Sequence, residues 1–201
     1  MSAGDENGFA FSAENRTRAE AITAKYPAGR QASAVIPLLD LAQRQNGNWL
    51  SEAAIHHVAD VLDMPYIRAY EVATFYTMFN LKPVGRYHVQ LCRTTPCWLR
   101  GSDDLAAVIR DRYGLADGGV TADGRFSLQE VECLGACVNA PVVQINDDYY
   151  EDLDAGSLAG ILDALERDET PPPGSAIRRQ GSAPATGPTT LGAPAPDAGE
   201  P

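Results

Sequence analysis

Long apolar segments are absent from this sequence of 201 residues. The longest one, residues 34–39, has six residues and includes Pro37, whereas a helix that crosses a bilayer needs about 20. We therefore expect no transmembrane helix and no direct membrane insertion. Residues 1–11 contain no Lys or Arg, so they resemble neither a secretory signal nor a transit peptide. The sequence predicts a protein that stays in the compartment where it is made.

Positive charge is also scarce. The chain has 16 Lys and Arg against 27 Asp and Glu, for a formal net charge of -11. Binding to nucleic-acid backbones or anionic lipids depends on basic side chains, so neither partner is expected. Residues 84–168 hold 7 basic and 15 acidic residues together with all four cysteines. The residues with metal or redox chemistry therefore lie in the acidic part of the chain.

Nucleotide-binding motifs are absent too. No G-x-G-x-x-G follows a predicted strand and no P-loop is present, so we expect no nucleotide site and no complete active site within the chain. The C-x-x-C motif of thioredoxin-like dithiols is also missing, which disfavours dithiol exchange as the function of the cysteines.

Composition and periodicity divide the chain into four segments. Residues 1–11 are expected to be a flexible N-terminus, residues 12–83 a helical region and residues 84–168 a small α/β domain. Residues 169–201 contain 8 Pro, 5 Gly and 6 Ala among 33 positions and no aromatic residue. Burial of so little apolar surface cannot offset the entropy of ordering, so we expect a disordered tail, or else an arm that orders on a partner.

Apolar residues at helical spacing predict four helices in the first region, at about 12–25, 31–45, 51–62 and 65–79. Ser12 and Ser51 are the expected N-caps of the first and third helices. Pro65 suits the start of the fourth helix because its fixed φ matches the first helical turn. Pro37 would kink the second helix unless it lies in the first turn.

Alternation typical of strands begins after residue 86. Strands are expected at 87–91, 126–131, 142–145 and 149–153, and helices at 103–113 and 157–167. The helix at 103–113 should have Ser102 or Asp103 as its N-cap and should stop at Gly114. The order strand, helix, strand, strand, strand, helix predicts helices packed on a small mixed sheet.

The four cysteines form two pairs, C-x4-C at Cys92 and Cys97 and C-x3-C at Cys133 and Cys137. Each pair begins where a predicted strand ends, so the two loops can meet at one sheet edge around one small inorganic centre. Disulfides are disfavoured in a chain without an export signal. Structural zinc is the main alternative, although it prefers C-x2-C spacing. A 2Fe-2S cluster takes two thiolates on each iron and tolerates wider spacing, which favours this interpretation.

Residues near the cysteines support a cluster but have simpler explanations. Gly135 removes a side chain where backbone amides would approach sulfur, or it only serves a tight turn. Thr94 and Thr95 can donate hydrogen bonds to the first pair. Five acidic residues within 147–154 would lower the potential of a cluster, or they form a solvated turn and a helix start. Trp98 would shield a cluster or face a partner, or it is simply packed.

Four motifs together resemble a known family. They are VATFYTMF at 72–79, PVG at 83–85, CRTTPCWLRG at 92–101 and ECLGACVNAP at 132–141. Over about residues 12–168 the chain resembles the E subunits of bacterial NADH:quinone oxidoreductase, respiratory complex I. Related subunits occur in mitochondria, in NAD-linked hydrogenases and in formate dehydrogenases. The tail at 169–201 lies outside the resemblance.

The resemblance implies a thioredoxin-like ferredoxin domain that holds one 2Fe-2S cluster through Cys92, Cys97, Cys133 and Cys137. It also implies an electron-transfer role, in which the chain exchanges single electrons with FMN in a neighbouring NADH-binding subunit. The expected location is the cytoplasmic peripheral arm of an inner-membrane complex, beside a further iron-sulfur subunit. The alternatives are the equivalent subunit of an NAD-linked hydrogenase or formate dehydrogenase and, in a different class, a zinc-stabilised interaction module.

Overall fold

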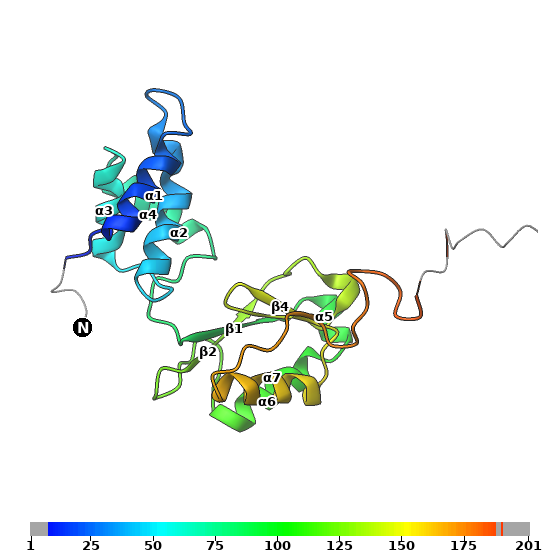
Figure 1. Cartoon of the computed structure of the whole chain (residues 1–201). Coiled ribbons are helices and arrows are strands. Elements are labelled where there is room, and N and C mark those ends of the chain that lie inside the picture. The colour runs from blue at the N-terminus through cyan, green and yellow to red at the C-terminus, as the bar shows by residue number, and fades with distance from the viewer. Residues whose placement is uncertain (1–7, 188–189, 191–201) are drawn as a thin grey trace, which may run out of the picture. The chain divides into compact units, whose positions relative to one another are not determined.

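The computed structural model describes residues 8–187 and 190 (Figure 1). The chain divides into two compact units, Met1–Arg86 and Tyr87–Pro201, close to the predicted boundary at 83. The first unit is helical and the second has helices and a five-stranded mixed sheet. The predicted α/β class with a helical N-terminal region is therefore confirmed. Within the described ranges, no helix combines the length and apolar character that a membrane span requires.

Within residues 8–86, the first unit has four α-helices and one short 3-10 helix. Their bounds are α1 Ala13–Thr23, η1 Gln31–Ala34, α2 Val35–Gln45, α3 Glu52–Val61 and α4 Tyr66–Phe75. Both predicted N-caps are confirmed, because Ser12 Oγ accepts a hydrogen bond from the Asn15 amide and Ser51 Oγ from the Ala54 amide, each at 3.2 Å. Pro37 lies in the first turn of α2, where an amide donor has no helical partner in any case.

Two predictions for the first unit are wrong. The expected flexibility of residues 1–11 does not hold at their end, because Phe11 is buried in the helical core and Phe9 packs against it. The Phe11 amide also donates a hydrogen bond of 3.2 Å to Nε2 of His57. The fourth helix ends at Phe75 and does not reach residue 79, because the chain turns extended at Tyr76 and lets Phe79 fold into the core.

The sheet of the second unit has the order β2-β1-β3-β4-β5. Its strands are β1 Tyr87–Cys92, β2 Phe126–Val131, β3 Val143–Ile145, β4 Asp148–Glu151 and β5 Gly174–Ser175. The pair β1–β2 is parallel, β1–β3 and β3–β4 are antiparallel, and β4–β5 is parallel. The predicted strands are all present, and β5 was not predicted.

A buried histidine links β1 to β2 through its side chain. The ring of His88 is almost fully buried, and its two nitrogens lie 2.8 Å from Ser127 Oγ and 3.1 Å from Gln129 Oε1. Burial lowers the pKa of His88, so the ring is neutral at pH 7. His88 is therefore a packed strand residue, as the sequence indicated, and it connects the two strands that lead to the cysteines.

The helices of the second unit are α5 Thr95–Leu99, α6 Ser102–Tyr113 and α7 Ala155–Glu166, with the short 3-10 helix η2 Cys137–Asn139. Helices α6 and α7 lie side by side along the sheet (Figure 1). The N-cap of α6 is Gly101, with a φ of +98° and no side-chain cap bond, so the prediction of Ser102 or Asp103 is wrong. Gly114 ends α6 in the left-handed conformation, as predicted.

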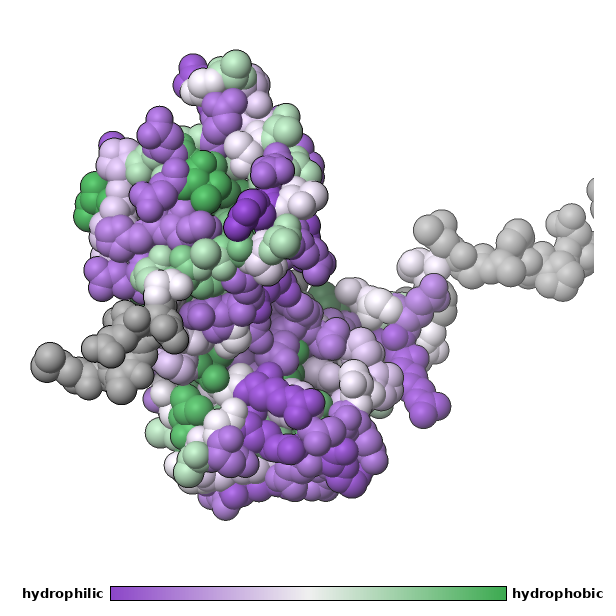
Figure 2. Space-filling model, turned by 60° about the vertical axis from the view of Figure 1, so that its left-hand side comes forward, coloured by the Kyte–Doolittle hydropathy of each residue, from purple (hydrophilic) through white to green (hydrophobic). Residues whose placement is uncertain are grey.

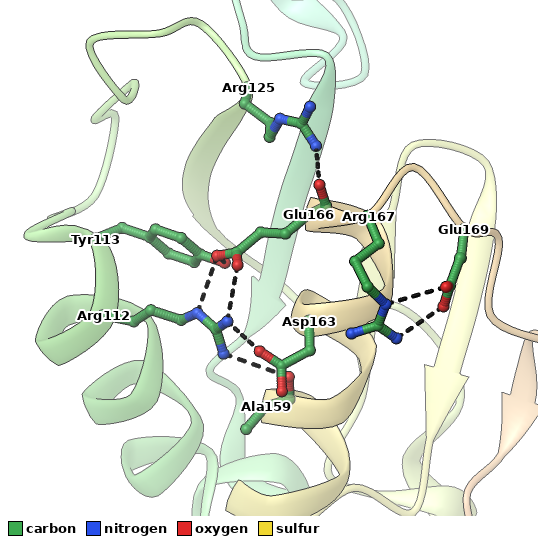
Figure 3. Close-up of polar contacts among 8 residues, drawn as sticks. All are labelled: Arg112, Tyr113, Arg125, Ala159, Asp163, Glu166, Arg167 and Glu169. Atoms are coloured by element: carbon green, nitrogen blue, oxygen red, sulfur yellow. Dashed lines mark hydrogen bonds and ion pairs between the residues drawn. The ribbon is translucent and has the colours of Figure 1, made fainter.

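Polar contacts join α6 to α7. The guanidinium of Arg112 points between two carboxylates of α7, donating to Glu166 at 3.0 and 3.1 Å and pairing with Asp163 (Figure 3). The Tyr113 hydroxyl donates to the same Glu166 at 2.7 Å. Hydrogen bonds from Arg112 lower the pKa of Glu166, so this carboxylate is charged at neutral pH. The same hydrogen bonds link α6 to α7.

The predicted tail at 169–201 is ordered over its first part. Residues 169–187 are described, and Gly174–Ser175 pairs with β4 as β5. The prediction of disorder therefore does not extend to residues 174–181, which bond to β4, Asn139 and Asp152 and do not need a core of their own. Beyond residue 187, the predicted tail lies outside the described residues, apart from residue 190.

Candidate metal centre

Two adjacent parallel strands bring the cysteines to one edge of the sheet. Strand β1 ends at Cys92, whose partner in the register is Val131, the last residue of β2. Cys133 therefore follows just beyond the end of β2. Cys97 lies in α5 and Cys137 begins η2. The predicted convergence of two strand-end loops is thus present, and all four cysteines are free thiols.

The thiols contact one another mainly in pairs. Cys133 Sγ and Cys137 Sγ are 3.3 Å apart, and Cys92 and Cys97 are buried neighbours, because Cys97 lowers the pKa of Cys92 and Cys92 raises that of Cys97. Cys137 also acts electrostatically on both Cys92 and Cys97, so the pairs adjoin. Over the described ranges, no three or more His, Cys, Asp and Glu side chains surround one ion position. Two adjoining dithiol pairs fit a flat two-iron cluster, in which each iron takes two thiolates.

Burial differs sharply between the two pairs. Cys92 and Cys97 are each 1% exposed and pack against Ala140 and Val142, whereas Cys133 and Cys137 are exposed. One side of the site is therefore anchored in the domain and the other side reaches the surface. Such a site can hold a charged group at the protein boundary without burying its whole charge.

Hydrogen bonds to sulfur favour thiolate at two of the four positions. Burial opposes ionisation of Cys92, but the Thr94 hydroxyl at 3.3 Å and the Leu134 amide outweigh it and lower its pKa. The Gly135 amide lowers the pKa of Cys133 in the same way. Burial raises the pKa of Cys97 to about 12. Thiolates are the form that binds metal, so the four sulfurs differ in readiness for binding.

Gly135 is required by backbone conformation. Its φ is +84°, and an added Cβ would meet no atom within 4 Å. The same conformation points its amide at Cys133 Sγ, at 3.4 Å. Of the two explanations offered for this glycine, the sharp bend with positive φ is seen directly, and the same bend supplies the amide donor.

Exposed apolar side chains lie on α5 and η2, the two contacting elements that bear Cys97 and Cys137. Trp98, Leu99 and Val138 are 55%, 70% and 66% exposed, and the Trp98 indole donates a hydrogen bond of 3.0 Å to Asp103. Trp98 therefore stands at the surface beside the site. Figure 2 shows a face that is mostly hydrophilic, with hydrophobic residues in smaller groups. We call Trp98, Leu99 and Val138, which are exposed close to cysteines in the sequence, the apolar patch.

Most of the acidic run after Cys137 has structural partners. Asp152 pairs with Arg179, Glu151 accepts a hydrogen bond from the Asn139 amide group, and Asp154 caps α7 with a capping box. The simpler explanation of this run, a turn and a helix start, fits these contacts. Arg179 and Asn139 were not among the predicted site residues, because no local pattern in the sequence connects either of them to the acidic run.

The α/β unit with two cysteine pairs at its sheet edge defines a ferredoxin-like metal protein. A sequence model of the thioredoxin-like [2Fe-2S] ferredoxins matches residues 19–166. The chain belongs to this family.

Similar sequences identify the branch of the family more closely. The E subunit of NADH-quinone oxidoreductase from Rickettsia bellii (strain RML369-C) is 62% identical over 160 residues, which make up 80% of this chain and 96% of the relative. The corresponding E subunit from Rickettsia conorii (strain ATCC VR-613 / Malish 7) is 61% identical over the same shares. The resemblance expected from the four motifs is therefore confirmed.

Solved structures of an NAD+-reducing [NiFe]-hydrogenase have the same fold. The air-oxidized form superimposes with a TM-score of 0.57 at 22% identity, covering 65% of this chain and 23% of the hydrogenase chain. The H2-reduced form gives a TM-score of 0.57 at 23% identity. This chain spans about a quarter of those hydrogenase chains, and at such identity the match concerns the fold alone.

Proposed function

We propose that this chain is the electron-transfer subunit of an NADH:quinone oxidoreductase and that Cys92, Cys97, Cys133 and Cys137 hold its single 2Fe-2S cluster. The supporting observation is the meeting of two cysteine pairs at the ends of adjacent parallel strands, in a chain 62% identical to an E subunit of such a complex. When bound, such a cluster accepts and releases one electron at a time.

The chain's own residues would prepare this site in two ways. The buried pair, Cys92 and Cys97, would anchor the cluster in the domain. Amides of Leu134 and Gly135 and the Thr94 hydroxyl aim at sulfur, and donors of this kind offset negative charge on thiolates. We expect Cys92 and Cys97 to bind one iron, and Cys133 and Cys137 to bind the other.

The exposed side of the site suits electron exchange with a partner. Cys133 and Cys137 are exposed, Trp98, Leu99 and Val138 are exposed on the contacting elements α5 and η2, and the sequence contains no nucleotide-binding motif. We therefore place FMN and NADH in a neighbouring subunit that covers this patch and passes single electrons to the cluster. A second iron-sulfur subunit of the same complex would lie nearby, in the peripheral arm on the cytoplasmic side of the membrane.

Metal content and spectroscopy test the proposal. The full chain purified without oxygen should contain about two iron and two acid-labile sulfide per chain, the stoichiometry of one such cluster, and should give an EPR signal after dithionite reduction. Replacing each of the four cysteines by Ser in turn should abolish or alter that signal. A colourless protein that contains zinc would instead support the interaction module.

Assembly tests the choice of complex. Pull-down of the full chain from its native cells should recover a flavin-containing subunit with NADH dehydrogenase activity and quinone-reducing subunits. Recovery of hydrogenase or formate dehydrogenase subunits in their place would contradict the proposed complex while leaving the cluster assignment intact.

A further inference from the structure

A segment beyond the family match lies against the loop that bears Cys137. The family model ends at residue 166, whereas residues 174–187 lie beyond it and begin with β5 at the edge of the sheet. Strand β5 pairs with β4, and the Ala176 amide donates to the Glu151 carbonyl at 2.9 Å. Further along, the Gly181 carbonyl accepts a hydrogen bond of 2.9 Å from the Asn139 side chain. We name residues 174–187 the C-terminal strap.

Arg179 is the central contact of the C-terminal strap. Its guanidinium forms an ion pair with Asp152, and the two side chains are only 12% and 8% exposed. The same guanidinium donates a hydrogen bond of 2.8 Å to the carbonyl of Val138, the residue after Cys137. Ser175 of the strap adds a hydroxyl bond of 2.7 Å to Asp152. One arginine therefore links the end of β4, the strap and the cysteine loop.

The short helix η2, Cys137–Asn139, is held from both sides by these contacts. The Asp152 amide donates to the Asn139 carbonyl at 2.7 Å, and the Asn139 side chain is buried and donates to Glu151. A turn of three residues has little stability of its own, because runs of 3-10 helix are short and poorly bonded. Its position must therefore depend on the neighbours that bond to it.

We infer that the C-terminal strap positions Cys137 for metal binding and that Arg179 is the positioning residue. This inference rests on the proposed function, since it takes Cys137 as a cluster ligand. Partners behind a ligand orient it, and their loss usually weakens metal binding by about 10- to 100-fold. Arg179 has a second effect, because it neutralises a carboxylate beside a site that becomes more negative on reduction.

Cluster retention tests the strap by point substitution in the full chain and by truncation. The variant Arg179→Ala and a chain that ends at residue 173 should both lose iron to a chelator about 10- to 100-fold faster than the parent chain. The matched controls are Arg178→Asn and a chain that ends at residue 187. Arg178 is exposed and has a positive φ that Asn tolerates, so Arg178→Asn removes the same charge from the same segment. Both controls should lose iron within about twofold of the parent rate, well below the loss expected on removing an orienting partner.

The midpoint potential separates positioning from simple loss of fold stability. Arg179→Ala should lower the potential, because Asp152 is left as an unpaired negative charge, whereas Arg179→Lys should restore most of the potential. A variant that merely unfolds more easily would keep the parent potential in the molecules that retain the cluster. Far-ultraviolet circular dichroism of each variant verifies that the domain is folded during the measurement.

The outcomes distinguish this inference from the proposed function. If the parent chain contains the cluster but Arg179→Ala loses iron at the parent rate with an unchanged potential, the strap inference is wrong and the proposed function stands. If Arg178→Asn has the same effect as Arg179→Ala, net charge explains the result and positioning does not. Absence of iron and sulfide from the parent chain would overturn the proposed function and the inference together.

Discussion

Replacing Gly135 by Ala should loosen the cysteine site through the backbone alone. Gly135 adopts a φ of +84°, where an L-residue is strained, yet its Cβ would meet no atom within 4 Å. The change therefore adds no clash with the protein and tests one variable, the cost of the left-handed conformation. That cost is about 1–2 kcal/mol for a residue with a Cβ.

The expected consequence for the cluster follows from this energy. If the variant relieves its strain by leaving the turn, the Gly135 amide no longer reaches Cys133 Sγ, which it approaches to 3.4 Å. A cost of about 1–2 kcal/mol corresponds to about a 5- to 30-fold larger population of the opened turn. Cluster release through that opened turn should accelerate by the same factor.

Gly124 provides a matched control in the turn before β2. It has a φ of +68° and its Cβ would also meet no atom within 4 Å, but its amide bonds to the Thr121 carbonyl at 2.9 Å, in a turn that contains no cysteine. Gly124→Ala should therefore lower the free energy of unfolding by the same ~1–2 kcal/mol without faster cluster loss.

Denaturant unfolding and chelator-induced bleaching, measured on both variants, complete the assay. Equal loss of stability with faster bleaching only for Gly135→Ala supports the reasoning, and Gly135→Asn should recover most of the parent rate because Asn tolerates positive φ. Equal bleaching rates for Gly135→Ala and Gly124→Ala would refute it.

Three further measurements concern the scaffold. Arg112→Ala should lower the free energy of unfolding by about 1 kcal/mol, because it removes ion pairs to α7 that are only partly exposed. The exposed control Arg110→Ala should change that free energy little. Equal effects of the two substitutions would contradict the role of the network. Ser51→Ala should cost about 1 kcal/mol in denaturant unfolding through loss of the α3 cap, and Ser51→Asn should restore it. Burial lowers the pKa of His88 below 6.5. The free energy of unfolding should therefore keep the full contribution of His88 above pH 6.5 and decline as the pH falls toward the folded-state pKa, since only the unfolded chain then takes up the proton. A variant His88→Gln with the same decline would exclude His88 as its source.

The parts of the fold that depend on residues close together in the sequence were predictable from it. Ser12 and Ser51 cap helices because their hydroxyls reach amides three residues away, and strand alternation located β1 to β4. The meeting of the two cysteine loops at one sheet edge could be predicted because each loop follows a strand. Their contact pairs, and the difference in burial between Cys92 and Cys133, required the three-dimensional arrangement.

The errors arose where tertiary contacts outweigh local pattern. The apolar stripe of α4 continues to Phe79 in the sequence, yet burying Phe79 by a turn in the chain replaces the last helical turn. The strap was not predicted because its segment is rich in proline and alanine. Its position depends on a contact between Arg179 and Asp152, 27 residues earlier in the chain. No local periodicity reports a bond of that kind.

The ring of His88 favours one register of β1 against β2. A slip of β1 against β2 by one residue would shift the two strands by about 3.3 Å and turn every side chain to the opposite face. It would also separate the imidazole from both Ser127 and Gln129. A polar contact near the start of the strands thereby helps to place Cys92 beside the end of β2, just before the loop that bears Cys133, at their far end.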